Sequence, residues 1–183
     1  PTPGFILNKY SIKYFNSFYY HFNSLTNPNK NIYYEPYFYP LDKIKNWNIL
    51  YGKDGFFQYQ FVIPYEAGFE GLSSILDKIV QSGYGSFLAV LKNFGEQNNN
   101  LLSFPKSGFT LALDIKFNKS IFKFLDLLDE MILEMNGRVY LAKDSRMSET
   151  TFKSFYPNWE IFQSVRKKYY GRNIFSSLQS KRI

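Results

Sequence analysis

The residues able to do chemistry in this sequence are lysine, glutamine, aspartate and tyrosine. The chain has no Cys and a single His, His21. A chain without Cys has no disulfide framework, no Cys-ligated zinc and no thiol nucleophile. One His rules out His-cluster metal sites and most Ser-His-Asp arrangements. We therefore expect no metal site, and any reaction must use Lys, Gln, Asp, Tyr or a bound cofactor.

Several of these residues fall on one side of the predicted strands. Side chains alternate between the two faces of a strand, so the apolar residues separate from a polar set. That set is Gln58, Gln60, Lys92, Thr110, Asp114 and Tyr140. Two amides, one carboxylate and the small Ala112 suit a hydrogen-bonding platform beneath a ligand or a second domain. The pattern also suits the solvated face of an antiparallel sheet, and the residues alone leave both interpretations open.

The elements that position this set follow from hydrophobic periodicity. Residues 56–63 alternate and end at Pro64, which predicts a strand. Further strands are predicted at 86–94, 109–117 and 138–142. Helical spacing of apolar residues from Leu72 to Val80, and again from Ile121 to Met135, predicts a helix after the first strand and another after the third.

The resulting order, β-α-β-β-α-β, predicts an α+β fold. We expect a ferredoxin-like antiparallel sheet with both helices on one face and the first and third strands in its centre. All 183 residues should form a single domain with three parts. Residues 1–50 are an aromatic extension, with an extended stretch at 33–39 and a short helix at 42–50. Residues 55–142 are the core. Residues 143–183 are a helical segment, with helices near 149–155 and 159–169.

The charge of the chain allows an anionic partner but does not specify one. The formal net charge is +7, from 22 Lys+Arg against 15 Asp+Glu. The Lys residues are scattered, and base-reading surfaces usually use Arg. An RNA-recognition module shares the predicted strand order, and residues 106–109 faintly resemble the start of its third strand. Gln58 and Gln60 stand where that module needs stacking aromatics, so we expect no nucleic-acid partner.

Five segments in order carry a family resemblance. They are GFFQYQFVIP at 55–64, SFLAVLKNFG at 86–95, LSFPKSGFTLALD at 102–114, GRVYLAKDSR at 137–146 and FYPNW at 155–159. Together they resemble the C-terminal substrate domain, or cap domain, of FAD-linked oxidases of the vanillyl-alcohol oxidase type. Within this type they are most similar to the branch that acts on polyprenyl-phosphate-linked pentoses. The resemblance is weak from Asn8 and strong from Tyr37 to the end.

The resemblance implies a FAD-dependent oxidoreductase. Such an enzyme oxidises a secondary alcohol of a sugar by hydride transfer to flavin N5. The FAD is held mainly by an N-terminal domain that this chain lacks, so we expect a fragment that is inactive alone. The expected partners are that N-terminal domain, a sugar or lipid-linked sugar, and a reductase. The expected location is cytoplasmic, with peripheral placement at the inner membrane face.

The resemblance also assigns site residues. Lys143 is the expected catalytic residue, beside the flavin and the substrate, and Tyr140 is a second expected flavin contact. The expected substrate-binding residues are Gln58, Gln60, Lys92, Phe94, Phe38 and Ala112. Relatives carry Tyr at the position of Phe38, Cys at Ala112 and Trp at Phe109. These differences concern the substrate rather than the flavin chemistry.

Two further alternatives remain at this level. An aldonolactone oxidase shares the overall plan, although its His-Trp pair near the pocket is missing here. A flavin-free interaction domain would use the same fold without a cofactor. A flavin spectrum of the full-length protein would separate these classes.

Overall fold

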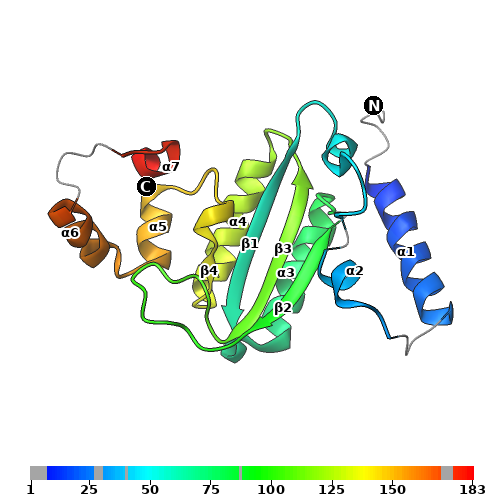
Figure 1. The fold of residues 1–183 in the computed structure, drawn as a ribbon, viewed down its shortest axis with the longest axis horizontal. Coiled ribbons are helices and arrows are strands. Elements are labelled where there is room, and N and C mark those ends of the chain that lie inside the picture. Colours follow the sequence, from blue (N-terminus) through cyan, green and yellow to red (C-terminus); the bar gives the residue numbers. More distant parts are fainter. Residues whose placement is uncertain (1–7, 27–30, 40, 87, 170–174) are drawn as a thin grey trace.

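The chain folds around a four-stranded antiparallel sheet, seen in a computed structural model that describes residues 8–26, 31–39, 41–86, 88–169 and 175–183. The strands are β1 (Phe56–Pro64), β2 (Ala89–Phe94), β3 (Gly108–Lys116) and β4 (Arg138–Val139). Their order across the sheet is β2-β3-β1-β4. This confirms the α+β class and the central place of the first and third strands. Helices α3 (Gly68–Ser82) and α4 (Ile121–Glu134) cover one face of the sheet (Figure 1).

The core lies between these two helices and the apolar face of the strands. Tyr59, Phe61 and Ile63 of β1 are buried in one cluster with apolar side chains of α3 and α4. Full burial of one such side chain contributes about 1.5–3 kcal/mol. Helix α4 ends at the predicted Asn136-Gly137 pair, where the Gly137 amide donates to the Ile132 carbonyl at 2.7 Å. A Cβ at Gly137 would lie 2.6 Å from the Val62 carbonyl oxygen, so only glycine fits there.

The fourth strand is shorter than predicted, and this decides where Lys143 lies. β4 pairs with β1 through only two residues, Arg138 and Val139. The Tyr140 amide still donates to the Gln60 carbonyl at 2.8 Å, and the Lys143 amide then donates to the Tyr140 carbonyl at 3.1 Å. The last part of the predicted strand is therefore a 3-10 turn, η3 (Leu141–Lys143).

The N-terminal extension also differs from the prediction. Helix α1 (Lys9–Thr26) carries many exposed aromatic side chains. The stretch expected to be extended forms a short helix instead, α2 (Tyr34–Phe38). Pro36 is tolerated because it stands in the first turn, where helical amides need no partner. The helix predicted at 42–50 is replaced by turns and a 3-10 helix, η1 (Trp47–Tyr51). A further 3-10 turn, η2 (Tyr65–Ala67), links β1 to α3.

Three helices follow the sheet. The predicted helices are confirmed as α5 (Glu149–Phe155) and α6 (Trp159–Tyr169), and α7 (Leu178–Arg182) comes after them. Ser148 caps α5 by accepting a hydrogen bond from the Thr151 amide. In Figure 1 these helices lie on the β4 side of the sheet, and α1 and α2 lie on the opposite side. Within the described residues, no helix has the length and apolar character needed to cross a bilayer.

Candidate active site

The predicted polar set is joined by hydrogen bonds across the two central strands. Gln58 stands opposite Asp114 in the register, and its Nε2 donates to Asp114 Oδ1 at 3.0 Å. Gln60 Nε2 donates to Thr110 Oγ1 at 3.2 Å. The Thr110 hydroxyl in turn donates to the Phe61 carbonyl at 2.7 Å. The two amides therefore lie side by side on one face, each held by a residue of β3.

Lys143 joins this set from outside the sheet. Its Nζ donates to Gln58 Oε1 at 2.6 Å. The contact completes a line of three side chains, Lys143–Gln58–Asp114. The chemistry fixes the direction of the amide in this line. An ammonium only donates and an ionised carboxylate only accepts, so Oε1 must face Lys143 and Nε2 must face Asp114.

The face that carries this line is not an open, solvated surface. Thr110 is 1% exposed and Asp114 is 4% exposed. Burial raises the pKa of the Asp114 carboxyl, and the Gln58 hydrogen bond and the Lys143 charge partly oppose this. The pKa of Tyr51, in η1, is raised by burial and by the negative charge of Asp114. The solvated-face interpretation is therefore wrong for the Asp114 end of the set.

Asp114 has one oxygen unused in this arrangement. Within the described part of the chain, Oδ2 is buried and has no hydrogen-bond partner. An unsatisfied buried charge destabilises a fold, and such groups gather at functional sites. The carboxylate therefore serves the orientation of Gln58 at some cost in stability.

The substitution Asp114→Asn measures the stability cost of the buried carboxylate. Because burial raises the pKa of Asp114, the folded state holds its proton more tightly than the unfolded state, in which an aspartate titrates near pH 3.9. The group thus destabilises the fold increasingly as pH rises through the raised pKa. The variant should keep its melting temperature at pH 7 or gain about 2–4 °C, the shift that about 1 kcal/mol gives in a domain of this size. Its advantage over the parent chain should shrink towards pH 4.

Calorimetric melting of both chains between pH 4 and pH 8 measures this difference. A conservative control is Asp77→Asn on α3, an exposed carboxylate, which should show no such trend. A melting temperature for Asp114→Asn that falls at pH 7 would mean that the carboxylate stabilises the fold. That result would contradict the stability cost argued above.

An aromatic wall stands next to the polar set. The Phe104 and Tyr140 rings stack with centroids 4.5 Å apart, and Phe94 meets Phe104 edge-on at 5.7 Å. Phe94 and Tyr140 were predicted, but Phe104 was not. It lies in the loop between β2 and β3, where no periodicity marks it; its burial, at 6% exposed, is what identifies it.

Buried Arg138 holds the loop that carries Phe104. Its guanidinium donates to the carbonyls of Ser103 and Phe155 and lies 5.1 Å from the Tyr156 ring centroid. Burial lowers the pKa of Arg138. The residue thus links the loop to α5 and sets the position of the aromatic wall.

The remaining predicted residues lie at different distances from this centre. Ala112 stands on the same face, paired in register with Gln60 and Val90. Lys92 is opposite Thr110 on the edge strand β2 and is exposed. Phe38 lies on α2, is 67% exposed, and has its ring against Tyr37. The structure therefore does not bring Phe38 into the set.

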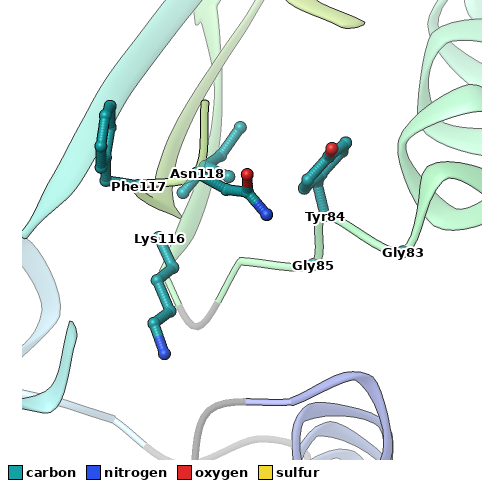
Figure 2. Close-up of a pocket in the computed structure, with 7 residues that line it drawn as sticks. Gly83, Tyr84, Gly85, Lys116, Phe117 and Asn118 are labelled. Carbon is teal, nitrogen blue, oxygen red and sulfur yellow. The ribbon is translucent and has the colours of Figure 1, made fainter. Parts of the chain in front are cut away.

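A small pocket lies elsewhere and does not belong to the polar set. It measures about 280 Å³ and is lined by residues 83–85 after α3 and 115–118 at the end of β3. Figure 2 shows Tyr84, Lys116 and Asn118 around it. In the described ranges, no group of three or more His, Cys, Asp or Glu could hold a metal ion.

The geometry defines an amide-and-lysine site on one face of an α+β sheet, and sequence comparison gives its family. The sequence pattern of the D-arabinono-1,4-lactone oxidase family matches residues 53–183. The chain belongs to this family, whose members are FAD-dependent oxidoreductases. The predicted resemblance to the C-terminal region of FAD-linked oxidases is therefore confirmed.

Two curated relatives extend the comparison. Over 147 residues the chain is 40% identical to decaprenylphosphoryl-beta-D-ribose oxidase of Mycolicibacterium smegmatis, covering 80% of this chain and 32% of that protein. It is also 29% identical over 113 residues to an uncharacterised protein in the mprA 5′ region of Streptomyces coelicolor, covering 61% of this chain and 31% of that protein. The chain thus spans about a third of the length of these curated relatives.

Proposed function

We propose that this chain is the substrate-side cap domain of a FAD-dependent oxidoreductase that oxidises a secondary alcohol of a sugar. The substrate class that fits best is a polyprenyl-phosphate-linked pentose. The single observation that carries the proposal is the Lys143–Gln58–Asp114 line, which combines a cation and an oriented amide on one partly covered face. The 40% identity to an oxidase of decaprenylphosphoryl-ribose supports the substrate class.

The positive charge of Lys143 matches the negative charge that a flavin ring acquires on reduction. When bound, FAD supplies N5 as the acceptor for the hydride that leaves the carbinol carbon of the substrate. Lys143 would hold the side of the ring on which negative charge develops, because a preorganised cation stabilises that charge. Tyr140 would be its aromatic neighbour. Gln58 keeps the ammonium in place through the 2.6 Å hydrogen bond.

The substrate would meet the rest of the set. Gln60, held by buried Thr110, presents an amide suited to sugar hydroxyls, and Ala112 leaves room beside it. Exposed Lys92 suits a phosphate or an outer hydroxyl. The wall of Phe94, Phe104 and Tyr140 would exclude water from one side, which strengthens the polar contacts. Lys143 and Lys92 are the candidates to orient the hydroxyl whose proton leaves.

The proposal places further components outside this chain. An N-terminal domain of the same polypeptide would hold most of the FAD. A reductase would be the next partner, because the oxidation yields a ketone that such an enzyme can reduce to an alcohol again. A lipid-linked substrate would place the protein at the cytoplasmic surface of the membrane.

The proposal is tested with the full-length polypeptide. It should purify yellow with a flavin spectrum, and a polyprenyl-phosphoryl-pentose should bleach the flavin under anaerobic conditions. The second candidate is an aldonolactone oxidase, favoured by the description of the matching family. Bleaching by D-arabinono-1,4-lactone and not by the lipid-linked pentose would select it. A colourless preparation that gains no flavin on incubation with FAD would contradict both.

A further inference from the structure

The turn that carries Lys143 is held on both sides by helix α7. Gln179 Nε2 donates to the Leu141 carbonyl at 2.7 Å, two residues before the lysine. Arg182 Nη2 lies 2.5 Å from Asp144 Oδ2, one residue after it. Both contacts reach across more than thirty residues of sequence, one to the turn itself and the other to the residue directly after it.

The Asp144 side chain links Arg182 to the backbone after Lys143. Its side chain is 3% exposed, and its Oδ1 accepts hydrogen bonds from the amides of Arg146 at 2.9 Å and Met147 at 2.8 Å. With Arg182 on Oδ2, both oxygens of the carboxylate are used. Charge-assisted bonds of this kind are the strong ones in a protein interior. The backbone directly after Lys143 is therefore fixed by its neighbour's side chain.

The start of α7 is fixed as well. Ser177 and Ser180 form a reciprocal capping box, with hydrogen bonds of 2.8 Å and 3.0 Å. Ile183 packs partly buried against the main core. The helix is thus tied down at its two ends, and Gln179 and Arg182 have fixed points from which to act.

The sheet does not hold the turn in the same way. β4 ends at Val139, and among the described residues the last backbone hydrogen bond from this segment to β1 is that of the Tyr140 amide. Lysine has four rotatable bonds along its stem, so its ammonium stays beside Gln58 only if the backbone below it is fixed. Helix α7 supplies that constraint in place of a longer fourth strand.

We propose that Arg182 and Gln179 are positioning residues that keep the Lys143 ammonium at the site. This rests on the proposed function, in which Lys143 faces the flavin. The pair would act through the turn and would touch neither flavin nor substrate. No substitution at either position should alter substrate selectivity.

The first test needs no flavin. Each lysine of the full polypeptide is acetylated with a small amine-reactive ester, and its rate is followed by mass spectrometry. Arg182→Ala should raise the acetylation rate of Lys143 about fivefold, as expected when one hydrogen bond is lost. Lys78, exposed on α3, should react as before. Arg182→Lys should restore part of the protection, and Lys181→Ala, an exposed neighbour on α7, should have no effect. Gln179→Leu serves as the second variant if Arg182→Ala does not fold.

The second test uses the flavin-loaded protein. The flavin midpoint potential should fall in Lys143→Ala, and in Arg182→Ala it should move part of the way in the same direction. Unchanged acetylation of Lys143 in both Arg182→Ala and Gln179→Leu would overturn the positioning role. A potential that moves in Lys143→Ala but not in Arg182→Ala would also overturn it. Acetylation of Lys143 that rises in Arg182→Ala would support the positioning role. If the flavin potential is then unchanged in both Lys143→Ala and Arg182→Ala, the proposed function is contradicted instead.

Discussion

Replacing Lys143 with alanine in the flavin-loaded full-length protein should slow flavin reduction by about 100-fold or more, the range seen when one preorganised charge or donor is removed. The Nζ atom is 2.6 Å from Gln58 Oε1, and that amide is held by Asp114. The ammonium is therefore in place before the reaction, and a variant without it must stabilise the developing negative charge with mobile water. Anaerobic stopped-flow bleaching of the flavin measures the rate.

The effect should appear in the limiting rate rather than in substrate affinity, because the charge acts in the transition state. The matched control is Lys78→Ala, which removes an exposed lysine from α3. Near-normal reduction in Lys143→Ala would remove the residue from the mechanism. A variant that binds substrate more weakly but reduces its flavin at the normal rate would make Lys143 a substrate-binding residue.

The second large effect concerns stability and a buried ion pair behind the site. Arg146 Nη2 lies 2.6 Å from Asp129 Oδ2, and the Tyr59 hydroxyl donates to Asp129 Oδ1 at 2.6 Å. Asp129 is 3% exposed. Burial raises the pKa of Asp129, and the charge of Arg146 opposes that rise. Removing the arginine leaves a buried carboxylate without its counter-charge.

Arg146→Met should therefore lower the free energy of unfolding by about 3–5 kcal/mol, the usual loss when one partner of a buried pair is removed. Urea unfolding at pH 7 measures it. The control is Asp126→Asn, because Asp126 pairs with the same arginine but has a side chain that is 62% exposed. This control should cost less than about 1 kcal/mol. Equal losses in the two variants would show that the burial of Asp129 does not set the cost.

How much of the site could be read from the sequence depends on the range of each contact. The shared face of Gln58, Gln60, Thr110 and Asp114 follows from two-residue alternation on strands whose central place could be inferred. Alternation does not give the register that places Gln58 opposite Asp114. The contact between Lys143 and Gln58 was expected only from the resemblance, since the turn that makes it replaces a predicted strand. No local pattern indicates that a two-residue β4 leaves the lysine on a turn.

Other features had no local signal at all. Phe104 lies in an irregular loop and is placed by Arg138, which holds the neighbouring Ser103 carbonyl. Arg182 and Gln179 act through a turn that precedes them by more than thirty residues. The error at residues 33–39 came from reading aromatic residues before Pro40 as extended chain, although Pro36 is compatible with a first helical turn.

The central pairing of β1 with β3 has a consequence for when the proposed site forms. Gln58 lies 56 residues before Asp114 and 85 residues before Lys143. Chains dominated by such distant pairings fold slowly, because the entropy cost of closing long loops comes before the contacts that offset it. None of the groups proposed to act on the sugar meets its neighbour until that closure has occurred. Partly folded molecules should therefore be wholly inert rather than weakly active, and assays of specific activity would then count correctly folded molecules.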